Sequence, residues 1–244
     1  MNLLRPVAAL VLSALALAAQ AAPMPSHVYL LDGSYADQNG GPPLGNDGGT
    51  LDATGYSFGI NQGLSLSNVL GTTYTIDFQS SFTNVSGYRK LVDFKDRNSD
   101  NGLYNNSTTL AFYPVATGPT GAFAPNVLSR VTITRDNTSG IFMGYVNGLQ
   151  QITFNDTGNL ATFSGAAQIA RFFEDDFVTG GGEASAGRVE YIRLFNTALS
   201  ATDVAGLTDP AGPGPVSPVP EPHTLALVMI ALLSGAGVTR ARKR

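Results

Sequence analysis

Alternating hydrophobic and polar positions dominate the middle of the chain, and they predict β-strands. Residues 72–79 (TTYTIDFQ) alternate and are rich in β-branched and aromatic side chains, which favours a strand with one buried face. Similar patterns predict strands over 88–94, 109–113, 130–134 and 188–195. Many short strands separated by glycine- and asparagine-rich breaks are typical of a β-sandwich rather than an α/β fold.

One hairpin and two short helical turns stand out from this pattern. Residues 141–154 (IFMGYVNGLQQITF) place an Asn-Gly dipeptide between two strand-like runs, which predicts a type I′ hairpin because both turn positions need positive φ. A helical turn is predicted at 67–70 and a longer one at 200–207. In the longer one, Ser200 and Asp203 have the spacing of a capping box.

The N-terminus has the composition of a signal peptide. Arg5 supplies a positive charge, residues 7–19 form an alanine- and leucine-rich core, and Ala-Gln-Ala at 19–21 has the small-x-small form of a cleavage site. We therefore expect a signal helix within residues 1–21 and a mature chain that begins at Ala22.

The C-terminus is a second hydrophobic segment. Residues 219–222 read Val-Pro-Glu-Pro, residues 225–238 are apolar, and four of the last five residues are basic. A helix over 225–238 would be about 21 Å long, whereas a bilayer core is about 30 Å thick. Flanking residues would lengthen the span, terminal Arg and Lys side chains would reach the headgroups, and the positive end would stay cytoplasmic. The alternative is a terminal helix docked on the domain.

This tail resembles the PEP-CTERM sorting signal of Gram-negative bacterial surface proteins, with Pro220, Glu221 and Pro222 as the recognition tripeptide. The resemblance covers residues 220–244. It implies export through the inner membrane, a membrane-embedded exosortase as partner, membrane contact through the C-terminal helix before processing, and delivery to the cell surface or extracellular matrix. Residues 210–219, rich in proline and glycine, predict a semi-rigid linker.

Between these ends, residues 22–209 have the length of one domain with a sizeable core. Five of the 14 basic residues but only one of the 18 acidic residues lie in the ends, so the domain carries a net charge near −8. A nucleic-acid partner is not expected, because phosphate backbones need basic patches. Acidic loops suit divalent cations or neutral glycans. The chain has no cysteine, so no disulfide stabilises the domain.

Four motifs occur along this domain in a familiar order: VYLLDGSYAD at 28–37, GYVNG at 144–148, VEYIRLF at 189–195 and TALS at 197–200. Together they resemble the laminin-G-like, concanavalin A-like lectin and glucanase family. The resemblance implies an all-β, concanavalin A-like jelly-roll sandwich of two antiparallel sheets, with about a dozen or more strands.

The same resemblance implies one structural calcium ion between the early aspartate loop and the last strand. The matching positions are Asp37 and Glu190, where the family more often has aspartate. The alternative for Glu190 is an ion pair with Arg188 or Arg193 on a face of the sheet.

Enzymes of the laminarinase type share this jelly roll and carry Glu-x-Asp-x-(x)-Glu on one strand, where alternation places two carboxylates on one face. Glu174, Asp175 and Asp176 provide the first half of that pattern, but Val178 and Thr179 stand where the second glutamate belongs. With no cysteine nucleophile and only two histidines, the sequence predicts that the protein is not an enzyme.

The acidic run Glu174, Asp175, Asp176 remains unusual in itself. Three consecutive carboxylates repel one another unless they are solvated or share a cation. It is therefore either a ligand or second cation loop, or a solvated loop before the Gly-Gly-Gly turn.

These patterns predict an exported surface or matrix protein whose lectin-like domain binds a glycan or another matrix component. The lack of tryptophan weakens the case for sugar stacking. The alternatives are a structural matrix protein without a specific ligand and a glycoside hydrolase acting on polysaccharide.

Overall fold

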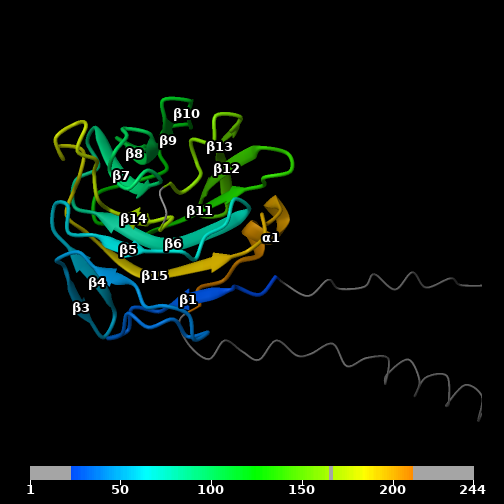
Figure 1. The fold of residues 1–244 in the computed structure, drawn as a ribbon. Helices are drawn as coiled ribbons and strands as arrows, with labels where there is room; N and C mark the ends of the chain where they lie inside the picture. The colour runs from blue at the N-terminus through cyan, green and yellow to red at the C-terminus, as the bar shows by residue number, and fades with distance from the viewer. Residues whose placement is uncertain (1–22, 165–166, 211–244) are drawn as a thin grey trace, which may run out of the picture.

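The computed structural model describes residues 23–164 and 167–210, and within them the regular secondary structure is almost entirely β-strand. Fifteen strands form two antiparallel sheets that lie one above the other, and one short helix follows the last strand (Figure 1). The prediction of an all-β sandwich of two antiparallel sheets is confirmed. The predicted signal helix (1–21), the linker beyond Pro210 and the sorting helix within 220–244 lie outside the described residues.

The first sheet is built around β6 (Tyr74–Phe82) and β15 (Gly187–Phe195), two nine-residue strands that pair antiparallel along most of their length. β1 (His27–Tyr29) and β4 (Gly55–Phe58) pair with different halves of the other edge of β15. The order is β13-β12-β11-β6-β15-β4-β3, with β1 beside β15. The remaining strands of this sheet are β3 (Thr50–Asp52), β11 (Ser129–Arg135), β12 (Ile141–Val146) and β13 (Leu149–Asn155).

The second sheet is also wholly antiparallel, in the order β10-β9-β8-β7-β14-β5-β2. Its strands are β2 (Gly45–Asn46), β5 (Leu64–Leu66), β7 (Tyr88–Asp93), β8 (Gly102–Asn106), β9 (Thr109–Tyr113), β10 (Ala116–Thr117) and β14 (Ala170–Phe172).

Aromatic side chains fill much of the space between the sheets. Phe58 from the first sheet stacks on Phe173, which follows β14, with ring centroids 4.5 Å apart, and Phe78 of β6 meets the same ring edge-on at 5.7 Å. All three are buried. Each such side chain contributes about 1.5–3 kcal/mol on full burial, so this core fixes which face of each strand points outward.

Two local predictions are confirmed. Asn147 and Gly148 have φ values of 51° and 79° and join β12 to β13, as the type I′ hairpin requires. The helix α1 (Ala201–Gly206) begins with a complete capping box, in which the Ser200 hydroxyl accepts the N–H of Asp203 and the Asp203 carboxylate accepts the N–H of Ser200.

The helical turn predicted at residues 67–70 is wrong. These residues form an irregular connection after β5, and Asn68 has a φ of 61°. A residue with its backbone in the left-handed region is incompatible with a right-handed helical turn at that position.

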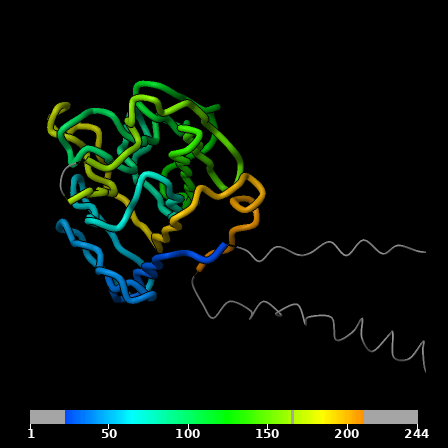
Figure 2. Tube along the Cα trace, turned by 45° about the vertical axis from the view of Figure 1, so that its right-hand side comes forward, coloured from blue at the N-terminus to red at the C-terminus, as the bar shows by residue number. Residues whose placement is uncertain are grey.

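The segment with α1 covers part of the outer face of the first sheet. Leu199 and Val204 pack against Tyr145 and Phe195, which point away from the main core. Figures 1 and 2 show the first described residues, in blue, close to this orange segment, and the Ser26 N–H donates to the carbonyl of Leu194. Within the described ranges, no helix has the length and apolar character needed to cross a membrane.

Candidate functional site

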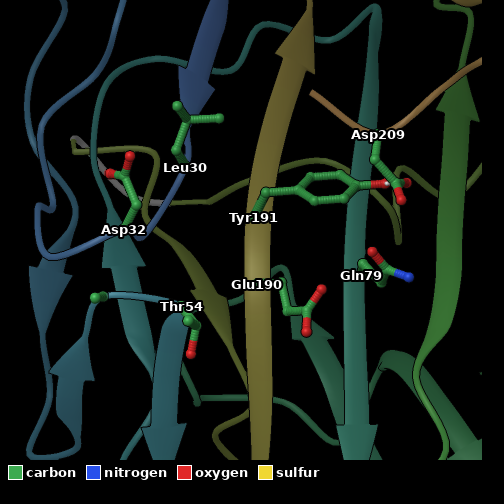
Figure 3. A pocket seen from close by; sticks show the side chains of 8 residues that line it. Leu30, Asp32, Thr54, Gln79, Glu190, Tyr191 and Asp209 are labelled. Carbon is green, nitrogen blue, oxygen red and sulfur yellow. Dashed lines mark hydrogen bonds between the residues drawn. The ribbon is translucent and has the colours of Figure 1, made fainter. Parts of the chain in front are cut away.

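A pocket of about 340 Å³ opens on the outer face of the first sheet, beside the covered region. We call it the Glu190 pocket. Figure 3 shows that its side chains come from β15, β6, the segment after β1, the β3–β4 turn and the segment after α1. The lining residues are Leu30, Asp32, Ala53, Thr54, Gln79, Glu190, Tyr191 and Asp209.

A β-bulge in β15 shapes the floor of this pocket. Val189 lies opposite Ser80 and Tyr191 lies opposite Gln79, so Glu190 is an extra residue in β15. Bulges re-aim side chains and are frequent beside functional sites. Here the bulge lets the neighbouring residues Glu190 and Tyr191 line the same pocket.

The wall formed by the segment after β1 depends on a backbone turn. Leu31 has a φ of 55° and is fully buried, whereas Asp32 is exposed and lines the pocket. On the same side of β15, Thr54 precedes Gly55, where an added Cβ would lie 2.7 Å from the carbonyl oxygen of Val189. Only glycine lets this turn approach β15 so closely.

The pocket is rich in hydrogen-bonding groups, and its charged groups are acidic. It offers the carboxylates of Asp32, Glu190 and Asp209 together with the amide of Gln79 and the hydroxyl of Thr54. Such a set suits a ligand that donates many hydrogen bonds.

One end of the pocket is closed by a hydrogen bond. The Tyr191 hydroxyl donates to Asp209 Oδ1 at 3.3 Å, a bond that Figure 3 also draws. Burial, with a contribution from the nearby Asp77 carboxylate, raises the pKa of Tyr191 well above its usual value. The hydroxyl therefore remains a proton donor at neutral pH.

Glu190 has no ion-pair partner within 4.0 Å among the described residues. Arg188 instead donates both terminal nitrogens to Asp52, at 3.0 and 2.9 Å. Arg193 donates its Nε to Asp77 Oδ2 at 2.7 Å. The alternative that Glu190 pairs with either arginine is therefore wrong, and its carboxylate faces the pocket.

Asp37 has a local structural role. Its Oδ1 accepts the N–H groups of Val28 and Asn39, and its Oδ2 accepts the N–H of Gly41 and faces His27 Nδ1 at 2.7 Å. Burial works against ionisation, but these donors together hold the pKa of Asp37 below its usual value. The lining residues of the Glu190 pocket include Asp32 but not Asp37. The calcium site on Asp37 and Glu190 stays a prediction.

The side chains of the acidic run are shielded from solvent, so its interpretation as a solvated loop is wrong. Glu174, Asp175 and Asp176 are 1%, 0% and 0% exposed. Glu174 Oε2 lies 3.1 Å from an Arg171 nitrogen and 3.8 Å from an Arg97 nitrogen. The arginines of neighbouring segments thus neutralise the first carboxylate of the run.

The other two carboxylates face a buried lysine that sequence reasoning did not single out. Lys90 Nζ lies 2.9 Å from Asp176 Oδ2, 3.7 Å from Asp93 Oδ2 and 3.9 Å from Asp175 Oδ1, and all four side chains are fully buried. Burial raises the pKa of Asp93. In the sequence, the one indication of this arrangement is that Lys90 stands next to apolar residues within the strand predicted at 88–94.

Further carboxylates extend this group. Within the described residues, one group of carboxylates has oxygens close enough to share a metal ion: Asp100, Asp176 and Glu183, within 4.8 Å of one another. We call Lys90 with its surrounding acidic residues the Lys90 cluster. Its members are Lys90, Asp93, Asp100, Asp175, Asp176 and Glu183.

Tyrosines lie next to the Lys90 cluster on the outer side of the second sheet. Tyr88 meets Tyr104 and Tyr113 edge-on, with centroids 5.3 and 5.8 Å apart. Tyr104 is fully buried, whereas Tyr113 is 39% exposed. This face therefore offers an aromatic surface without tryptophan.

Comparison with known proteins shows similarity in fold. No family model matches the chain, and no curated protein matches it. Trypanosoma rangeli sialidase, solved as a covalent intermediate with 2,3-difluorosialic acid, is similar with a TM-score of 0.57 and 14% identity over 75% of this chain and 33% of the sialidase. Domain 4 of AbnA, a GH43 extracellular arabinanase from Geobacillus stearothermophilus in complex with arabinotriose, has a TM-score of 0.55 and 14% identity over 76% of this chain and 98% of that domain.

The chain thus spans about a third of the sialidase but matches nearly the whole arabinanase domain. The prediction that the protein is not an enzyme is contradicted, because the structures similar to it in fold include parts of two glycoside hydrolases. That prediction rested on an incomplete local carboxylate pattern, the lack of cysteine and the presence of only two histidines. Carboxylates from distant segments can also meet, as Asp100 and Glu183 do here.

Proposed function

We propose that this domain binds carbohydrate and that the Glu190 pocket holds the sugar. The pocket itself is the observation that carries this proposal. Its volume of about 340 Å³ lies at the lower end of the range for small-molecule sites, roughly 300–1,000 Å³, and suits one or two sugar rings. Its polar groups project mainly from paired strands and a tight turn, which hold hydrogen-bonding groups in fixed positions.

The charge of the pocket favours a neutral sugar. Asp32, Glu190 and Asp209 accept hydrogen bonds from hydroxyl groups but repel a carboxylate or sulfate. An arabinose oligosaccharide, such as the one in the similar arabinanase domain, is neutral, whereas the sialic acid in the similar sialidase is an anion. We therefore expect a neutral oligosaccharide as ligand.

The finer assignments belong to the same proposal. The jelly-roll arrangement of the concanavalin A-like family fits the two-sheet sandwich, and the motifs at 28–37 and 189–195 support it. The tail at 220–244 supports export, recognition by an exosortase and a place at the cell surface, where polysaccharides are abundant.

A panel of neutral and acidic oligosaccharides immobilised on a surface tests the proposal. We expect binding to neutral sugars, and we expect Gln79→Ala and Glu190→Gln to weaken it at least tenfold. Gln150→Ala is the matched control, because Gln150 is exposed on β13 at the far edge of the same sheet. Binding to no sugar, or binding that both pocket variants leave unchanged, would overturn the proposal. Release of shortened sugars would identify the pocket as an active site if Glu190→Gln stopped it.

A further inference from the structure

The Lys90 cluster holds more negative charge than its described partners neutralise. It contains five carboxylates and one ammonium group, and Lys90 contacts three of the five. The nearby Arg97 does not neutralise these carboxylates, because its Nε donates to the backbone carbonyl of Asp175 rather than to a carboxylate of the cluster. Buried carboxylates that lack a counter-charge are costly, so the cluster calls for a further cation.

The carboxylates of Asp100, Asp176 and Glu183 provide the geometry for one. Their oxygens lie within 4.8 Å of one another. Two oxygens that share a calcium ion at about 2.4 Å are at most about 4.8 Å apart. Asp176 is buried, whereas Asp100 and Glu183 are partly exposed, so an ion can enter from solvent.

A neighbouring carboxylate gives a second, independent indication. Asp175 is fully buried, and its Oδ2 accepts the N–H of Glu183 at 2.8 Å and the hydroxyl of Thr179 at 2.9 Å. Its Oδ1 has no hydrogen-bond partner and lies 3.9 Å from Lys90 Nζ, on the residue next to Asp176. Buried polar atoms are nearly always partnered, so an unpartnered carboxylate oxygen here points to a missing positive ligand.

A hydroxyl group lies beside two of these carboxylates, as outer-shell hydrogen-bond donors do around metal ligands. The Tyr104 hydroxyl lies 3.0 Å from Asp100 Oδ1 and 3.4 Å from Asp176 Oδ2, so its one proton can be donated to either carboxylate and orient it.

We propose that Asp100, Asp176 and Glu183 bind a calcium ion, with Asp175 Oδ1 as a neighbouring anionic group. An all-oxygen set drawn from separate segments suits calcium, which accepts six to eight oxygens in flexible geometry, better than magnesium, which demands an octahedron. The ion would link the β7–β8 connection, which carries Asp100, to the segment between β14 and β15. This site is separate from the Glu190 pocket and does not depend on the carbohydrate proposal.

The experiment uses the full chain after chelation. Calcium is titrated by calorimetry, and terbium is titrated by its luminescence after excitation of tyrosine. The chain has no tryptophan, and Tyr104 touches two of the ligands, so it is the expected donor. Asp100→Asn and Glu183→Gln should each lower the affinity at least about tenfold, because even outer-shell partners are worth about 10- to 100-fold. Tyr104→Phe should cut the sensitised emission several-fold while a calcium-binding signal persists.

Control variants distinguish this site from others. Asp209→Asn makes the same chemical change as Asp100→Asn but in the Glu190 pocket, and it should leave calcium affinity unchanged. A loss of affinity in Glu190→Gln would instead assign the binding to the predicted site on Asp37 and Glu190. Asp100 and Glu183 are chosen because they are partly exposed, and circular dichroism checks that these variants fold. The proposal is overturned if folded wild-type protein gives neither heat nor luminescence, or if the pocket variants lose affinity while Asp100→Asn and Glu183→Gln do not.

Discussion

The Lys90 ammonium lies 2.9 Å from Asp176 Oδ2, and neither side chain is exposed. It also lies 4.3 Å from the centre of the Tyr104 ring, so a cation–π contact stabilises its charge in addition to the carboxylates. Lys90 is on β7 and Asp176 follows β14, the strand that pairs with β7. This contact therefore joins neighbouring strands of the second sheet through their charged side chains.

Replacement of Lys90 by methionine should strongly destabilise the protein. The change keeps much of the side-chain volume but leaves buried carboxylates without their ammonium, which costs about 3–5 kcal/mol when one partner of a buried pair is removed. Urea unfolding of the chelated protein at neutral pH measures the loss. Lys95→Met is the matched control, since Lys95 Nζ donates to carbonyl oxygens of Asn159 and Thr162, and its loss should cost only about 1 kcal/mol. Equal, small losses in both variants would contradict this account of Lys90.

Arg135 should not tolerate lysine. Its guanidinium is almost fully buried and donates to Asp156 Oδ2 at 2.7 Å, to the carbonyl of Thr72 at 2.6 Å and to Asn159 Oδ1 at 2.9 Å. An ammonium cannot reach all three acceptors from one position, so Arg135→Lys should cost about 1–3 kcal/mol through unsatisfied buried groups.

Thermal and urea unfolding measure this loss. The control is Arg188→Lys, because Arg188 and Asp52 form a solvent-accessible pair, which should change stability by less than about 1 kcal/mol. If both arginine variants unfold like the wild type, the Arg135 contacts do not stabilise the fold.

The strands could be predicted from the sequence because they depend on local alternation. Residues 109–113 form β9 with the predicted bounds, and the Asn147-Gly148 turn needs only its own positive φ values. The Glu190 pocket could not be predicted in this way. Asp32 and Asp209 line the same pocket because β15 pairs with both β1 and β6, and a one-residue bulge changes the direction of the side chains of β15.

The burial of the acidic run was unpredictable for the same reason. Asp175 and Asp176 look like surface residues in sequence, and their burial depends on the distant Lys90 together with donors from Thr179 and the N–H of Glu183. Asp37 shows the opposite case. The sequence places it correctly in the first loop, but its hydrogen-bond donors become evident only when that loop folds back on β1.

Asp37→Asn should make stability less dependent on pH under acidic conditions. The folded protein holds the pKa of Asp37 below its usual value through donors from Val28, Asn39, His27 and Gly41, although burial opposes this. An ionised Asp37 therefore stabilises the fold above the pKa of the unfolded chain, about 3.9, and this contribution is lost as pH falls through the lower folded pKa.

Urea unfolding at a series of pH values tests this sign. The wild type should be more stable than Asp37→Asn at neutral pH, by about 1–3 kcal/mol, and the difference should shrink as the solution is acidified. Asp203→Asn, a partly exposed residue of the α1 capping box, is the control for a general acid effect. A difference that grows at low pH would show that Asp37 is not stabilised in its ionised form.

Removal of every residue after Pro218 should leave the stability of the domain unchanged. The segment 199–209 already packs on the first sheet through Leu199 and Val204, and Asp209 accepts the Tyr191 hydroxyl, so the described sandwich has its own C-terminal contacts. The tail at 220–244 is instead expected to direct sorting. Equal melting temperatures for the full and shortened chains support this division, whereas a drop of several degrees would mean that the tail packs on the domain.

In cells that contain the sorting machinery, Glu221→Ala should block processing of the full chain without changing its melting temperature, and normal processing of that variant would remove Glu221 from the proposed signal.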